Sequence, residues 1–121
     1  MQRREIKNGI VLRICCGFSC GEHAEALHRA ACRTIDDRNL GQEVGLDEQS
    51  CYGKCFAGPN ILVERWRDGQ RNESALLAIM LGRPHDDLVY EEGVIVDDIP
   101  NLIRRHHAAW RRSLEKDDHD S

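Results

Sequence analysis

Four of the six cysteines in this 121-residue sequence fall into two local pairs. Four residues separate Cys15 from Cys20, and three separate Cys51 from Cys55. Thiolates are soft ligands, and two short loops that meet at one end of a sheet can offer four of them to one metal centre. Glycines, which let a backbone approach such a centre closely, flank both pairs: Gly17, Gly21, Gly53 and Gly58.

The cysteines have three possible interpretations: they form disulfides, bind zinc or hold an iron-sulfur cluster. A chain of this length can bury a hydrophobic core and does not need disulfide bonds for its stability. The N-terminus is charged and has no apolar segment followed by a cleavage site, so we predict no secretory signal and expect a cytoplasmic protein. In a reducing compartment, six cysteines indicate metal ligands or catalytic groups rather than disulfides.

The spacing then separates the two metals. Structural zinc usually uses two-residue Cys-x-x-Cys bites, whereas wider loops suit a 2Fe-2S cluster, which takes four cysteines. The spacing favours the cluster and leaves zinc open. Cys20 also comes just before an expected helix, whose positive N-terminal end favours a thiolate.

The chain around the cysteines alternates between predicted strands and helices. Residues 9–15 (GIVLRIC) and 60–66 (NILVERW) are apolar and β-branched, as in buried strands, and residues 43–50 indicate a weaker, short edge strand. Residues 22–39 predict a helix, because Ala24, Leu27, Ala31 and Ile35 form one apolar stripe. Each cysteine pair therefore follows a predicted strand.

The C-terminal third predicts the rest of the sheet and a last helix. Residues 87–90 and 93–96 are short apolar pieces, and one or both should complete the sheet. The last helix starts near Asp97 and Pro100 and carries Ile99, Leu102, Ile103, His106, Trp110 and Leu114 at helical spacing. The polar residues 116–121 predict a disordered acidic tail.

Composition excludes several classes of function. The net charge of −4 and the pI near 5.8 argue against a general nucleic-acid binder, and aromatics at 5% give no stacking platform. The longest uncharged apolar stretch, residues 74–82, is about half of a membrane span. The familiar hydrolase, phosphate-loop and dinucleotide motifs are absent from the sequence.

The stretches "CCGFSC" and "CYGKCFAGPNILV" resemble the thioredoxin-like 2Fe-2S ferredoxin family, which includes free ferredoxins and the peripheral 2Fe-2S subunit of NADH dehydrogenases and hydrogenases. The resemblance implies an α/β, thioredoxin-like fold: a mixed sheet of about four strands with flanking helices, in one domain over residues 1–121. It implies one 2Fe-2S cluster with Cys15, Cys20, Cys51 and Cys55 as ligands. The implied function is one-electron transfer rather than catalysis.

Three features depart from the family pattern. The spacer between the pairs is short, Cys16 offers an alternative pair with Cys20, and residues 71–86 look like an insertion before the final strand. We assign Cys15 as the ligand because its spacing matches the family. We expect the insertion to pack on the sheet, with a partner-facing element as the alternative, and Cys32 to be a buried side chain in the first helix.

A 2Fe-2S electron-transfer protein could have either of two physiological roles. The short segment before the first strand favours a free carrier, as a monomer or homodimer, whose partners are donor and acceptor oxidoreductases. The alternative is an electron-transfer subunit of a larger NADH dehydrogenase, formate dehydrogenase or hydrogenase complex. From other classes, a zinc-stabilised binding module stays open, whereas a thiol-disulfide enzyme lacks its Cys-x-x-Cys.

Overall fold

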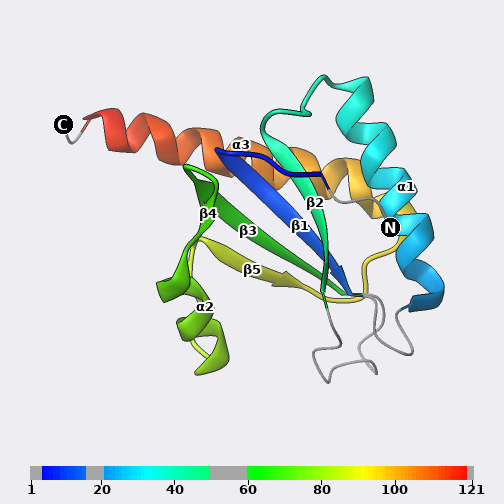
Figure 1. Cartoon of the computed structure of the whole chain (residues 1–121), viewed down its shortest axis with the longest axis horizontal. Coiled ribbons are helices and arrows are strands. Elements are labelled where there is room, and N and C mark those ends of the chain that lie inside the picture. The colour runs from blue at the N-terminus through cyan, green and yellow to red at the C-terminus, as the bar shows by residue number, and fades with distance from the viewer. Residues whose placement is uncertain (1–3, 16–20, 50–59, 120–121) are drawn as a thin grey trace.

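A computed structural model describes residues 4–15, 21–49 and 60–119 as one mixed sheet with three helices. The elements follow in the order β1 (Gly9–Cys15), α1 (Gly21–Asp37), β2 (Val44–Gln49), β3 (Ile61–Arg67), β4 (Gln70–Arg71), α2 (Glu73–Met80), β5 (Leu88–Glu91), the 3-10 turn η2 (Val96–Asp98) and α3 (Ile99–His119). The twisted strands lie across α3, and α1 packs beside it (Figure 1). The class is therefore α/β, as predicted.

The sheet has both parallel and antiparallel pairs. β1 lies between β2, which runs parallel to it, and β3, which runs antiparallel. β4 and β5 both pair with β3 in antiparallel register, β4 near its end and β5 along its first four residues. The predicted edge strand before the second cysteine pair is confirmed as β2.

The main core lies between the sheet and the two long helices. Alternate residues of β1, at Ile10, Leu12 and Ile14, are fully buried and pack with inward residues of β2 and β3. All four residues of the predicted α1 stripe are buried against them. A strand exposes alternate side chains to alternate faces, which explains why every second β1 residue enters this core.

Helix α3 closes the core from the same side. Ile99, Leu102, Ile103 and Trp110 are buried in it, whereas Leu114, at the same helical spacing, is 38% exposed. The four arginines of this helix, Arg104, Arg105, Arg111 and Arg112, are exposed. The helix extends to His119, so it includes residues 116–119, the first part of the predicted tail.

The last strand is a single short one. β5 covers Leu88–Glu91, and residues 93–96 form no strand, because Gly93 turns the chain with φ 61° and η2 begins at Val96. Pairing with β3 is complete once Glu91 reaches Ile61. The second apolar piece instead supplies Val94 to the core.

The outer face of the sheet, opposite α1 and α3, is covered more thinly. Helix α2 packs Ala75 and Ile79 against Leu62 and Leu88 there, so the helical part of residues 71–86 packs on the sheet as expected. The N-terminal segment pairs with β2 in an antiparallel bridge between Arg4 and Leu46. In the part of the chain described here, no helix has the length and apolar character needed to cross a membrane.

Candidate functional site

The C-terminal ends of β1 and β2 lie side by side at one end of the sheet, and the cysteine motifs connect there. We call this end of the sheet the cysteine edge. The parallel register pairs Cys15, the last residue of β1, with Gln49, the last residue of β2. β3 starts at the same edge, because Ile61 pairs with Ile14. Residues 16–20 and 50–59, with the ligand candidates Cys20, Cys51 and Cys55 and the extra Cys16, lie outside the described residues.

Helix α1 begins at this edge with Gly21, immediately after Cys20. The first four backbone N–H groups of a helix have no acceptor within the helix, and the N-terminus carries a partial positive charge. Both properties stabilise a nearby thiolate. The start of α1 therefore agrees with the expectation that a helix begins just after Cys20.

An ionic network crosses the outer face of the sheet close to this edge. Arg13 lies two residues before Cys15, and its side chain is only 12% exposed. Its Nε donates to Glu64 Oε1 at 2.5 Å, and its Nη1 donates to Asp47 Oδ2 at 3.1 Å. The guanidinium thus joins three neighbouring strands, β2, β1 and β3.

Glu64 is the centre of that network, with a side chain 1% exposed. Its Oε2 accepts hydrogen bonds from Nε of Arg71 at 2.8 Å and from Nη2 of the same residue, and Trp66 Nε1 donates to Oε1 at 3.3 Å. A buried carboxylate needs such donors, because an unpaired buried charge costs several kcal/mol. The two arginines and two carboxylates sum to zero charge.

Sequence reasoning did not identify this network. Arg13 and Glu64 were visible only as charged interruptions in two apolar strands. Opposite charges at such positions are a usable signal, since a strand buried on both faces admits a charge only if a partner lies opposite. Pairing the two strands would have required the register, which sequence reasoning did not supply.

Cys32 lies away from the cysteine edge, in the second half of α1. It was expected to be buried and is partly buried at the margin of the core, and its Sγ lies 3.8 Å from His28 Nδ1. Near the end of the same helix, Asp36 accepts two hydrogen bonds from the guanidinium of Arg4, at 3.0 and 3.2 Å. The hydrogen bond with Asp36 raises the pKa of Arg4 above its ordinary value.

The two adjacent histidines of α3 each contact a carboxylate on or next to the sheet. His106 Nε2 lies 2.8 Å from Glu91 Oε1, and His107 Nε2 lies 3.0 Å from Glu43 Oε1. Both histidine side chains are about 15% exposed or less. Among the residues that the structure describes, no three His, Cys, Asp or Glu side chains group to hold a metal ion.

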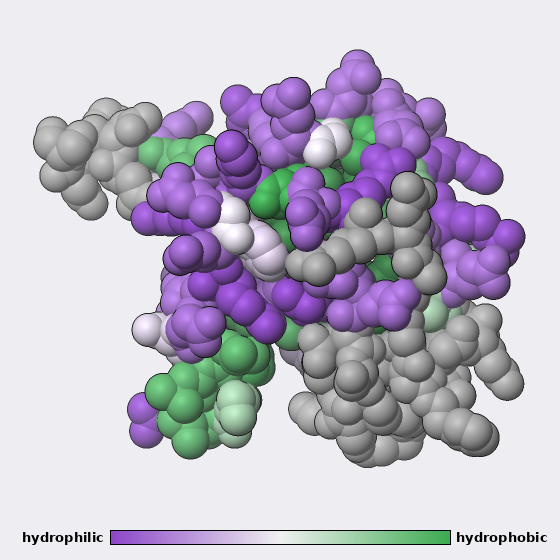
Figure 2. Space-filling view, viewed as in Figure 1, coloured by the Kyte–Doolittle hydropathy of each residue, from purple (hydrophilic) through white to green (hydrophobic). Residues whose placement is uncertain are grey.

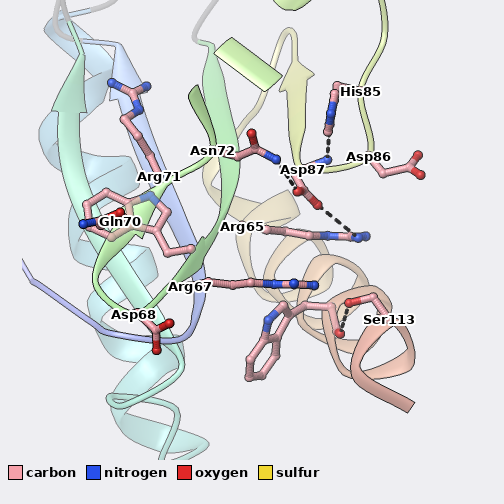
Figure 3. A pocket seen from close by; sticks show the side chains of 12 residues that line it. Arg65, Arg67, Asp68, Gln70, Arg71, Asn72, His85, Asp86, Asp87 and Ser113 are labelled. Carbon is pink, nitrogen blue, oxygen red and sulfur yellow. Dashed lines mark hydrogen bonds and ion pairs between the residues drawn. The ribbon is translucent and has the colours of Figure 1, made fainter. Parts of the chain in front are cut away.

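A pocket of about 570 Å³ lies at the other end of the sheet, between the end of β3 and α3. The Arg65 and Arg67 side chains extend side by side toward Ser113 (Figure 3). Arg65 is paired with Asp87 at 3.7 Å, and Asp87 also accepts from Asn72 at 2.7 Å. Because carboxylates accompany the arginines, the pocket has no clear preference for an anion or a cation.

Comparison with known proteins adds no assignment. No protein-family model matches this chain, and no curated protein is significantly similar to it.

Proposed function

We propose that this protein is a one-electron carrier that holds one 2Fe-2S cluster through Cys15, Cys20, Cys51 and Cys55. The observation that carries the proposal is the parallel register of Cys15 with Gln49 at one edge of the sheet. Two residues of chain reach at most about 7 Å, so Cys51 is covalently held near Gln49. Cys20 is likewise held next to Gly21, the first residue of α1.

We infer that the fold is thioredoxin-like. The long strands are ordered β2-β1-β3-β5, with β3 antiparallel to both β1 and β5, and α1 and α3 cover one face. A mixed sheet with helices packed against it agrees with the arrangement implied by the sequence resemblance. Under this interpretation, β4 and α2 are additions between the last two strands.

The donor set fits the group. A 2Fe-2S cluster of the ferredoxin type is held by four thiolates, takes up one electron when it is reduced, and has a potential that depends on nearby charge and hydrogen bonds. The positive end of α1 favours the thiolate form of Cys20. Opposite charges cancel in the ionic network of Arg13, Asp47, Glu64 and Arg71, so it adds no net charge near Cys15. The network also connects the strand that carries this ligand to the neighbouring strands.

The deciding experiment is spectroscopy of the whole protein purified without air. We expect a red-brown sample with broad bands between about 400 and 550 nm that bleach on addition of dithionite, because thiolate-to-iron charge transfer gives this colour. Chemical analysis should find two irons and two acid-labile sulfides per chain. A colourless protein with one bound zinc would contradict the proposal and would indicate the zinc-stabilised module.

A further inference from the structure

Helix α2 is apolar on almost all sides, although it lies on the surface. Its sequence, ESALLAIM, has six apolar residues in eight and continues into Leu81. A helix that is apolar all round normally has a partner on more than one side. Among the described residues, α2 packs on the sheet alone, where Ala75 is buried and Ile79 is partly buried.

The side of α2 that faces away from the sheet carries the largest exposed apolar side chains of the described residues. Leu77 is 58% exposed, Met80 is 74% exposed and Leu81 is 62% exposed. They form the apolar patch at the α2 corner of Figure 2, beside a mostly hydrophilic sheet face. We call these three side chains the α2 stripe.

Opposite charges stand at the two ends of the stripe. Glu73 is exposed in the first turn of α2, four residues before Leu77 and therefore on the same side of the helix. Arg83 is exposed just past the other end, where its N–H bonds Ala78 O at 2.8 Å and Gly82 adopts φ 74°. This backbone pattern is a helix-terminating turn, and it holds Arg83 directly after the helix.

We propose that the α2 stripe binds a second copy of this chain, with the two α2 helices antiparallel about a two-fold axis. A two-fold interface must be self-complementary. Antiparallel pairing meets that condition, because it sets Leu77 of one copy near Met80 of the other. It also sets Glu73 of each copy near Arg83 of its partner, whereas parallel pairing would set like charges together.

The size of the stripe determines the strength of this pairing. A stable interface normally buries about 800 Å² on each partner, which is more than three side chains and two charged residues supply. The dimer is therefore weak and depends on concentration, with a dissociation constant in the micromolar range or above. The inference uses only α2 and its flanks and does not depend on the cysteine cluster.

Sedimentation velocity over a range of concentrations tests the proposal on the full chain. We expect a reversible monomer–dimer equilibrium that Met80→Glu weakens by roughly thirtyfold or more, as for a central apolar contact. Ile95→Glu is the matched control, because Ile95 is 57% exposed, lies outside α2 at the start of η2, and the substitution changes the net charge equally. The control variant should dimerise like the parent, and circular dichroism checks that both variants are folded.

Charge reversal tests the antiparallel geometry. Glu73→Lys and Arg83→Glu should each weaken the dimer by about tenfold, since each change creates two like-charge contacts. Combining them restores opposite pairs and should recover most of the parent affinity. A protein that stays monomeric at millimolar concentration, or a dimer that Met80→Glu does not weaken, overturns the proposal; a double variant as weak as the single variants overturns the antiparallel arrangement.

Discussion

Arg13 on β1 and Glu64 on β3 form a buried ion pair, 2.5 Å from Nε to Oε1, across adjacent antiparallel strands. Arg13 is two residues from Cys15, so the pair braces the strand that ends at the proposed cluster. Glu64 has a second arginine partner, Arg71, and Arg13 has a second carboxylate partner, Asp47. Side-chain ion pairs therefore connect the strands of the sheet in addition to the backbone hydrogen bonds.

Glu64→Gln should strongly destabilise the fold. The substitution keeps the size of the side chain but removes the charge between two arginines, and breaking a buried pair in this way costs about 3 kcal/mol of unfolding free energy. Chemical denaturation monitored by circular dichroism measures the change. Glu25→Gln, on the exposed side of α1, is the control and should cost less than about 0.5 kcal/mol. Equal effects of the two substitutions would show that the network contributes nothing specific.

Gly9→Ala should also destabilise the protein, for a steric reason. A Cβ on Gly9 would lie 1.9 Å from the backbone oxygen of Glu43, and the glycine φ of 149° is one that side chains rarely adopt. That oxygen accepts the hydrogen bond of Ile10 N, so a shift would separate β1 from the start of β2. We expect a loss of about 2–4 kcal/mol.

Gly41→Ala is the matched control for Gly9→Ala. A Cβ there meets nothing within 4 Å, so the unfolding free energy should change by less than about 0.5 kcal/mol. Thermal melts of the two variants, side by side with the parent, make the comparison. Similar melting temperatures for both variants would contradict the close approach at Gly9.

Asn72→Ala should loosen helix α2. The Asn72 side chain accepts hydrogen bonds from Ser74 N at 3.0 Å and Ala75 N at 3.2 Å, and it donates to Asp87. Loss of an N-cap of this kind costs about 1 kcal/mol. Hydrogen exchange should become faster in α2 and stay unchanged in α1, and an unchanged rate in α2 would show that the cap is dispensable.

The cysteine variants test the ligand set directly. Cys51→Ser and Cys55→Ser should each abolish the visible absorption, because a 2Fe-2S cluster requires all four thiolates. Cys32→Ser should keep the full spectrum, since Cys32 lies in the second half of α1 beside His28, away from the start of that helix. A Cys51→Ser protein with a complete cluster would show that the assignment is wrong.

Cys15 and Cys16 need a separate comparison. If Cys15 is the ligand, Cys15→Ser should lose the cluster and Cys16→Ser should retain it. The opposite result would move the first pair to Cys16 and Cys20 without changing the proposed function. Iron and sulfide analysis of both variants, purified without air, gives the answer.

The sequence by itself determined the elements and the main core. The apolar runs and stripes predicted β1, α1, β2, β3 and α3 close to their observed bounds, because hydrophobic periodicity reflects which side of an element is buried. It also placed each cysteine pair next to a strand end. These are local properties, and neighbouring residues are sufficient to express them.

Only the tertiary structure decided which elements lie together. The parallel register that sets Cys15 beside Gln49 and the antiparallel register that sets Arg13 near Glu64 join residues more than thirty positions apart. Register depends on how two faces pack and on turn geometry, which no single segment contains. For the same reason, the composition of α2 could not show which of its apolar side chains the sheet would cover and which would stay exposed.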